Sequence, residues 1–456
     1  MHLVSSVVNK LPSIGRLWST KEHVHSPSRE HPQNLPPIAP LAVSLPLPPD
    51  NMAPDGLLLP PEIDDYMMSV FATLPDGPQL LRLAALVCRA WLAASRVHLY
   101  RDVTIQTEGQ FDEFERVVID SPMINDCVRI LRLDRRGRKY ELNFPWVNTK
   151  LASALPKALK RLETLEMLSI EEKWRAESFR KLSSFTSVTT LSLDRCGFST
   201  EELLGVISAF PSLMNLRIVD FIELFNGRDE NVQLMHPPQP LRLVLHCDDI
   251  PSHSMGKENL LDYLLKSGCE DTVRSLDIQV SKRNVLHVKQ FIQKLGPSLE
   301  ELRLGFVRRF GHYDEDLDML NTVDLSSNTN LQHITFVDPA PLAVQSLLAS
   351  LANPLSGIRT ISFAVRVYDV KSVTSAKNVK NPSLASVLTE AIDARIIPRH
   401  ARIRFLVDWD PAKVKGVQER SNVWEQLELV REEFETAYCY LKEERMLDVV
   451  RQSFSD

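Results

Sequence analysis

The sequence predicts an α/β protein in which a short helical unit is followed by an array of strand-plus-helix units and a C-terminal helical cap. Three observations predict this. A six-residue apolar phrase recurs along the chain, apolar stripes at helical spacing lie between its copies, and a proline-rich head gives way to a helical pattern near Leu59. With 456 residues, the chain is long enough to bury a sizeable core.

The composition is that of an ordinary soluble protein, with 44% hydrophobic residues, 25% charged residues and a formal net charge of −6. A mildly acidic chain argues against bulk capture of nucleic acid or of an anionic membrane. The six cysteines lie far apart and form no C-x-x-C pair, so we expect reduced thiols in a cytoplasmic or nuclear protein. Prolines and polar residues interrupt the two uncharged stretches, 32–49 and 339–358, so no membrane span is expected.

Residues 1–56 are predicted to form a disordered leader, because ten of the 29 prolines lie in residues 1–54. The first twenty residues carry apolar side chains at helical spacing with Lys10 and Arg16, a pattern that resembles a mitochondrial presequence. Pro12 interrupts the pattern and arginines are few, which favours the cytoplasm or the nucleus.

Residues 57–105 predict three helices that lead into a strand. Pro60-Pro61 suits a helix start, and an apolar face follows at spacings of three and four, ending before Pro75-Asp-Gly-Pro78. A second apolar run covers 80–87, a third helix follows Cys88, and β-branched residues begin at Val103. The residues of the first apolar face are Ile63, Met67, Val70, Phe71 and Leu74.

Residues 106–420 contain the repeated phrase apolar-x-x-apolar-x-apolar. Steps between copies range from 23 residues (Leu168 to Leu191) to 42 residues (Ile361 to Ile403), so the array is irregular. Eight copies are clear and two are weaker: 128–133, 165–170, 188–193, 213–218, 273–278, 299–304, 331–336 and 358–363, with 243–245 and 403–405.

One copy spells the leucine-rich-repeat pattern, because Val188 to Phe198 places Cys196 where that pattern accepts Asn or Cys. Ser199 and Glu202 then predict a capping box for a helix that ends at Pro211, and similar helices are expected at 285–295 and 342–351. We therefore expect an irregular leucine-rich-repeat-like α/β solenoid, a horseshoe. A doubly wound sheet is the alternative, but ten strands of near-identical phrase favour the solenoid.

Residues 421–456 are predicted to form a C-terminal helix, with Val423, Leu427, Val430, Phe434, Tyr438 and Leu441 on one face. The expected role is to cap the last repeat. Docking on a partner is the alternative.

No motif for catalysis or nucleotide binding is present: the sequence lacks G-x-G-x-x-G, G-x-x-x-x-G-K-[ST], G-x-S-x-G and H-E-x-x-H. We therefore expect neither an enzyme nor a cofactor. His246-Cys247-Asp248-Asp249 with His253, and Asp314, Asp316 and Asp318, lack the spacing of metal ligands, so solvated loops are expected there. The basic clusters 135–139 and 308–309 form no continuous stripe, and nucleic acid is not an expected partner.

The segment 59–91 resembles the F-box, particularly its fungal F-box-like form, in Leu59-Pro60-x-Glu62-Ile63, Met67, Phe71 and Val87-Cys88-Arg89-x-Trp91. The resemblance covers about a tenth of the chain. It implies a substrate-recognition subunit of a cullin-RING (SCF-type) ubiquitin ligase, with no catalytic residues of its own. This copy carries Met67 and Phe71 where Ile and Leu are common, and it inserts 75–78. The residues that would bind or support binding of the Skp-family adaptor are Leu59, Pro60, Ile63, Met67, Val87 and Trp91.

Three other interpretations stay open. The six residues assigned to adaptor binding could instead be core residues of a helical cap on the solenoid. The chain could be a repeat scaffold that engages no ligase. It could also be an enzyme, which would require a pocket with converging acid and base groups. The repeats would bind an unidentified protein substrate through solvent-facing strand positions of both charges. Those candidates are Arg132, Asp134, Asp194, Arg217, Asp277, Arg303 and Arg366.

Overall fold

The structure is a computed structural model of the full chain. It describes residues 60–74, 76–135, 147–151, 155–171, 174, 176–223, 240–246, 255–266, 268–280, 284–306, 324–337, 357–367, 388, 391–392, 397, 400–409, 428, 432, 435–436, 438, 441–442 and 446–453. The predicted leader at 1–56 and the predicted helix at 342–351 lie outside these residues.

Three helices pack together at the start of the described chain, as predicted: α3 (Pro61–Thr73), α4 (Gly77–Ala84) and α5 (Arg89–Arg101). Pro61 occupies the first turn of α3, where its missing N–H costs nothing. The Cys88 thiol caps α5 by accepting the Trp91 backbone N–H at 3.4 Å. A Cβ at Gly77 would lie 2.7 Å from the Phe71 carbonyl oxygen, so the turn between α3 and α4 requires glycine there.

A twelve-stranded, all-parallel sheet makes up most of the described protein. Its order, β1-β2-β3-β4-β6-β8-β9-β10-β11-β12-β13-β14, follows the chain without the reversal that defines a doubly wound sheet. A two-residue pair, β5 (Gly197–Phe198) and β7 (Ile222–Glu223), forms a second small sheet. All ten predicted phrases are strands. The strands of the large sheet are β1 (Asp102–Ile105), β2 (Ile130–Asp134), β3 (Thr164–Leu168), β4 (Thr190–Asp194), β6 (Asn215–Val219), β8 (Arg242–His246), β9 (Ser275–Val280), β10 (Glu301–Phe306), β11 (His333–Val337), β12 (Thr360–Val367), β13 (Arg402–Trp409) and β14 (Leu447–Ser453).

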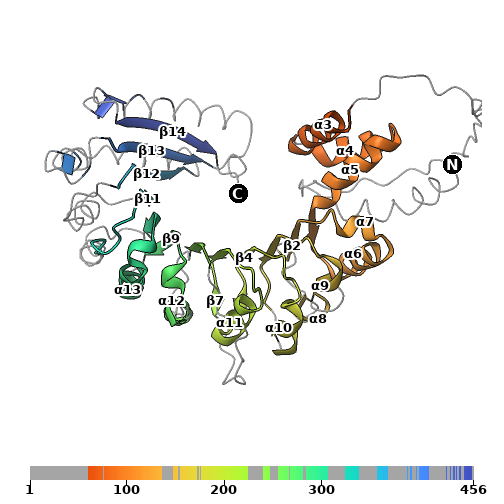
Figure 1. The fold of residues 1–456 in the computed structure, drawn as a ribbon, viewed down its shortest axis with the longest axis horizontal. Helices are drawn as coiled ribbons and strands as arrows, with labels where there is room; N and C mark the ends of the chain where they lie inside the picture. The colour runs from red at the N-terminus through yellow and green to blue at the C-terminus, as the bar shows by residue number, and fades with distance from the viewer. Residues whose placement is uncertain are drawn as a thin grey trace, which may run out of the picture.

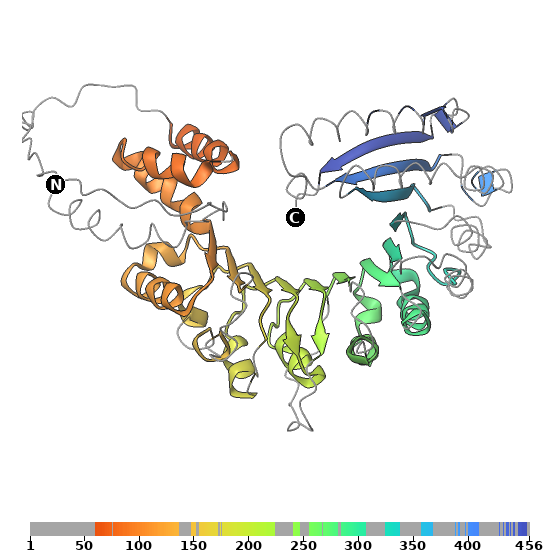
Figure 2. The same ribbon diagram turned by 180° about the vertical axis from the view of Figure 1, so that it is seen from behind.

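Within the described residues, helices connect most of the successive strands from β1 to β10, and they lie on the convex side of the curved sheet (Figures 1 and 2). In α11 both halves of the predicted capping box are present, and the second Glu202 oxygen accepts the Trp174 backbone N–H at 2.7 Å. None of the described helices is both long and apolar enough to cross a bilayer. The connecting helices are α6 (Glu108–Asp120), α7 (Pro122–Asn125), α8 (Val147–Lys150), α9 (Leu155–Ala158), α10 (Ala176–Leu182), α11 (Thr200–Ser208), α12 (Met255–Lys266) and α13 (Val285–Leu295), with 3₁₀ turns at Cys269–Asp271 and Gly296–Ser298.

The core is built from two apolar rows that cross the sheet in register. The fourth position of each phrase forms one row, from Leu131 through Leu191 and Leu302 to Ile403, and the sixth position forms the other. In the second row Phe336, Phe363 and Phe405 stack with ring centroids 5.6 and 5.4 Å apart. These side chains are almost fully buried and belong to one continuous cluster with the helices.

The strand predicted at the end of residues 57–105 is present as Asp102–Ile105, and it pairs with β2 of the large sheet. One prediction about the tail is wrong. Leu447–Ser453 forms strand β14 against β13, although a helix was predicted to continue through the tail. Val449 and Val450 are β-branched, and pairing with the exposed edge of β13 satisfies backbone groups that a helical cap would leave open.

The described residues between β13 and β14 do pack as expected of a helical layer. Tyr438 and Leu441 are fully buried in the main core, and the Tyr438 ring lies 4.7 Å from that of Phe405. Two residues of the face predicted in the tail, Tyr438 and Leu441, therefore pack against the sheet, and the other four, at 423, 427, 430 and 434, lie outside the described residues.

We expect Phe363→Ala to lower the free energy of unfolding by about 3–5 kcal/mol, because it opens a cavity between two stacked rings. Chemical denaturation followed by circular dichroism measures the change. Leu286→Ala on the exposed side of α13 is the control and should shift stability by about 0.5 kcal/mol or less. Equal effects of the two substitutions would contradict the packing described here.

Thiol reactivity should separate the cysteines by burial. Burial raises the pKa of Cys196 and of Cys269 to about 12, so neither forms the reactive thiolate at pH 8. Iodoacetamide labelling of the native protein should modify the exposed Cys88 and spare these two until the chain is unfolded. Mass spectrometry of tryptic peptides reads out the result, and early labelling of Cys196 would contradict it.

Candidate functional site

The concave side of the sheet, which faces away from the helices, carries most of the residues predicted to bind a substrate. Arg132, Arg217, Asp277 and Arg303 lie in one row across neighbouring strands, in register with Glu166 and Ser192. Asp134 and Asp194 lie two positions further along, in the next row on the same side. Arg366 lies in β12 opposite Asp408 of β13, and its side chain is outside the described part.

Arg132 holds the first charged cluster of this row. Its guanidinium pairs with Asp102 at 2.5 Å and with Glu166 at 2.7 Å, so one cation is shared between two carboxylates. Burial, with a smaller contribution from Glu166, raises the pKa of Asp102 although Arg132 acts to lower it, and the Asp102 Oδ1 atom is buried without a hydrogen-bond partner in the described structure. Burial opposes the charge on Arg132 too, but the two carboxylates outweigh it and raise its pKa.

Asp277 holds the second cluster. It lies 2.6 Å from Nε2 of His246 and 3.5 Å from Nε of Arg303. Arg217 is exposed, and within the described residues its guanidinium reaches the Ser192 hydroxyl at 3.5 Å. Among the predicted residues, Arg132, Asp277 and Arg303 therefore form charged contacts between adjacent strands. Sequence reasoning missed the partners Asp102, Glu166 and His246, although the register of the phrases places them beside the predicted residues.

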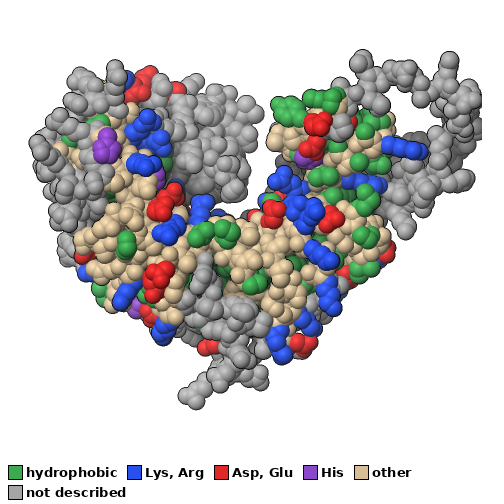
Figure 3. Space-filling model, viewed as in Figure 1, with side chains coloured by type: hydrophobic (Ala, Val, Ile, Leu, Met, Phe, Trp, Pro, Cys, Tyr) green, Lys and Arg blue, Asp and Glu red, His purple; other side chains and the backbone are tan. Residues whose placement is uncertain are grey.

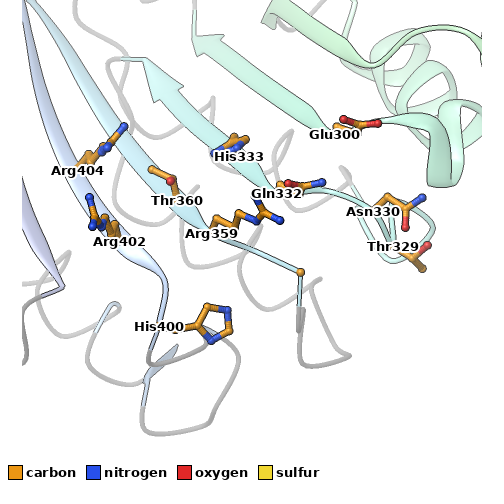
Figure 4. Close-up of a pocket in the computed structure, with 11 residues that line it drawn as sticks. Glu300, Thr329, Asn330, Gln332, His333, Arg359, Thr360, His400, Arg402 and Arg404 are labelled. Carbon is orange, nitrogen blue, oxygen red and sulfur yellow. The ribbon is translucent and has the colours of Figure 1, made fainter.

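A pocket of about 850 Å³ lies near the start of strands β10 to β13. Three arginines and two histidines line it against a single glutamate (Figure 4). None of these residues was predicted as a site, although Arg402 and Arg404 follow the same period-two alternation as the residues that were. The lining residues are Glu300, Thr329, Asn330, Gln332, His333, Gly357, Arg359, Thr360, His400, Arg402 and Arg404.

The described residues expected to bind the adaptor are presented in two different ways. Ile63 and Val87 are exposed at 43% and 64%, and Pro60 is exposed too. Met67 and Trp91 are half-buried and pack against the small core of Met68, Leu81 and Ala84. Leu59 lies outside the described residues.

The Trp91 indole is held inside the unit, because its Nε1–H donates to Asp64 Oδ1 at 2.8 Å. Asp64 is itself 8% exposed. Trp91 therefore supports the helical packing and presents only part of its ring outside. The exposed neighbours Tyr66, Val70, Leu83 and Leu86 were not predicted as site residues. Hydrophobic side chains are visible on the surface of this unit in Figure 3.

Metal ligation finds no support in the described residues, where no group of three His, Cys, Asp or Glu side chains converges. His246, the only described member of its weak sequence cluster, is engaged with Asp277. The predicted loops at 247–253 and 314–318 lie outside the described part of the chain.

Comparisons with known proteins identify no family. No protein-family model and no curated protein matches the chain. A solved structure of a Bacteroides fragilis protein is similar over 57% of this chain, at 14% identity and a TM-score of 0.28. The match spans 64% of that protein's length. Likeness at this level supports no conclusion about function.

Removing the shared cation should make stability depend on pH in a defined direction. In Arg132→Gln, Asp102 faces Glu166 without the neutralising guanidinium, so the folded-state pKa of Asp102, which burial already raises, rises further above its unfolded value. The folded protein then binds more protons than the unfolded chain between those values, and stability falls as pH rises through that range. Both groups are partly exposed, so we expect an extra loss of about 1 kcal/mol between pH 4.5 and 7.5 relative to the wild type.

Denaturation of both proteins at the two pH values measures this difference. Arg217→Gln is the control, since Arg217 has no carboxylate partner in the described structure and is exposed. An equal pH dependence in Arg132→Gln and wild type would show that the cluster contributes nothing to stability.

Proposed function

We propose that this protein is a non-catalytic substrate-recognition subunit of a cullin-RING (SCF-type) ubiquitin ligase. In this proposal α3, α4 and α5 are an F-box-like unit that binds a Skp-family adaptor. The sheet is a leucine-rich-repeat-like horseshoe, and the strand side chains on its concave side bind a protein substrate. Holding the substrate raises the effective concentration of its lysines near the ligase, which accelerates transfer without chemistry on this chain.

The observation that carries the proposal is the concentration of exposed apolar side chains on the helical unit. Eight of the 13 large hydrophobic side chains exposed in the described residues belong to residues 60–101, which are a small part of the chain. Such a patch on a soluble protein marks a contact surface for another protein. The eight residues are Ile63, Tyr66, Val70, Leu74, Leu83, Leu86, Val87 and Val97.

The exposed large apolar residues of α3 and its C-cap lie on one side of the helix. Ile63, Val70 and Leu74 are separated by seven and four residues, a spacing that aligns side chains along a helix. Leu83, Leu86 and Val87 lie at the end of α4 and in the turn that follows it. These positions coincide with the segment whose sequence resembles the F-box, and this agreement supports an adaptor as the partner.

The sheet supports the second half of the proposal. The side chains on its concave side are polar and include positive and negative charges, and they are fixed on paired strands. A pattern of that kind discriminates between protein partners by charge complementarity. A repeat scaffold that engages no ligase remains the second candidate function, because the apolar patch alone does not specify which protein covers it.

Leu86→Asp with Val87→Asp should abolish adaptor binding. Both side chains are exposed, at 70% and 64%, so the change charges the patch without disturbing the core of the unit. Central apolar contacts of an interface each contribute about 2 kcal/mol or more, so affinity should fall more than tenfold. Co-purification of the full chain with adaptor and cullin, followed by titration against purified adaptor, measures the loss.

Met123→Asp on α7 is the matched control, since Met123 is 79% exposed and lies outside the helical unit. It should retain full binding. Trp91→Ala is less informative, because loss of its packing and of its bond to Asp64 would unfold the unit. A wild-type chain that fails to bind the adaptor would favour the scaffold instead.

A further inference from the structure

We propose that two copies of this chain associate through the rim of the sheet where strands β2 to β10 begin, around a two-fold axis that passes through Met214. The inference does not depend on the ligase proposal, because the rim residues lie within 129–300 and the helical unit lies within 60–101. The partner is a second copy because the rim is complementary to itself.

The rim is a row of the residues that immediately precede seven neighbouring strands. Along the row, the backbone N–H of each residue donates to the carbonyl oxygen of the row residue before it, at 2.8–2.9 Å. Because neighbouring strands lie about 4.8 Å apart, the row is about 29 Å long. All these strands are parallel, so the row lies on one side of the arc that they follow in Figure 1. In order, the row is Arg129, Glu163, Thr189, Met214, Leu241, Arg274 and Glu300.

The middle of the row is apolar and exposed to water. Met214 and Leu241 are 44% and 39% exposed, and they are neighbours in the row. Of the large hydrophobic side chains exposed in the described residues, only five lie outside the helical unit, and these two are among them. Association would remove both from water, as the apolar centre of an interface requires.

Each end of the row carries one arginine and one glutamate. Arg129 lies 3.3 Å from Glu163 at the first end, and Arg274 lies 3.9 Å from Glu300 at the second. All four side chains reach solvent, so they are accessible to a partner. The charges along the row therefore run positive, negative, neutral centre, positive, negative.

Reversing this row places an opposite charge at every charged position. When two rows lie antiparallel with Met214 opposite Met214, Arg129 of each copy faces Glu300 of the other copy. Glu163 of each copy then faces Arg274 of the other. A closed two-fold interface requires this self-complementarity, because every contact between unlike residues occurs twice. The charge pattern thus specifies both the partner and the antiparallel orientation.

The shape of the rim permits the same arrangement. A two-fold axis along the radius of the arc reverses the row but keeps its curvature, so the two arcs overlie each other. Beside the row, the hydroxyls of Ser187, Thr272 and Ser298 donate to carbonyl oxygens of the preceding unit, which keeps this side smooth. A standard interface covers about 800 Å² per partner, about 28 Å across if square, and the row is long enough to span it.

Sedimentation velocity of the full chain tests the association. At up to about 100 μM the wild type should be mostly dimeric, as a Kd of micromolar order implies. Met214→Asp should weaken the dimer at least tenfold, because two carboxylates would face each other on the axis in place of an apolar contact. A monomeric wild type, or a dimer that Met214→Asp leaves unchanged, would overturn the proposal.

Leu286→Asp is the matched control. Leu286 is 60% exposed and lies in α13, which follows the carboxyl end of β9 and therefore begins away from the rim. This variant should dimerise as the wild type does. Equal weakening by Leu286→Asp and Met214→Asp would contradict the assignment of the rim.

Two charge-exchange variants provide a test that misfolding cannot imitate. The first is Arg274→Glu with Glu300→Arg, and the second is Arg129→Glu with Glu163→Arg. Each keeps one cation beside one anion within the chain but brings like charges together across the two-fold axis. Each variant alone should therefore dimerise at least tenfold more weakly than the wild type.

An equimolar mixture of the two variants should recover the dimer. In the mixed pair, every charged position of one chain faces an opposite charge on the other, as in the wild type. A mixture that remains as weakly associated as its components would overturn the antiparallel pairing.

Adaptor binding, measured on the same variants, keeps this test separate from that of the ligase proposal. Met214→Asp should bind the adaptor as the wild type does. A chain that dimerises through the rim but binds no adaptor would support this inference and contradict the ligase proposal.

Discussion

The fold depends on the burial of two continuous apolar rows, each formed by one position of a short repeated phrase. A single strand with its helix leaves apolar edges exposed, and the next unit in the chain covers them, so each unit is stable only through its neighbours. Leu191, for example, is fully buried because Leu165 and Leu216 lie on either side of it in the row. This requirement fixes the register of all twelve parallel strands and explains why their order follows the chain.

The same register creates the polar surface. Because side chains alternate along a strand, burying the fourth and sixth positions of a phrase sends the fifth to the opposite side. Neighbouring strands lie about 4.8 Å apart, so charged residues at the fifth position form contacts across strands. Arg132 and Asp277 are neutralised in this way, whereas the arginines near the start of β12 and β13 gather around a pocket. The charged surface thus follows from the packing of the core.

The helical unit has a much smaller buried core than the sheet. Only Met68, Leu81 and Ala84 form its buried apolar core, supported by half-buried neighbours such as Trp91, while the sheet has one long continuous core. A unit this small buries a low fraction of its apolar surface. Its exposed leucines and valines are a consequence of that size, and a protein partner would complete the burial.

The sequence by itself determined the strands that carry the repeated phrase, the three helices at 61–101 and the alternation of side chains along those strands, because these depend on local periodicity and capping. The ten phrases and the capping box of Ser199 and Glu202 are examples. Only the tertiary structure decided that Leu447–Ser453 is a strand, that Trp91 is tied to Asp64, and that Arg359, Arg402 and Arg404 share a pocket. Each of these depends on contacts between residues far apart in the chain, whose partners no local pattern specifies.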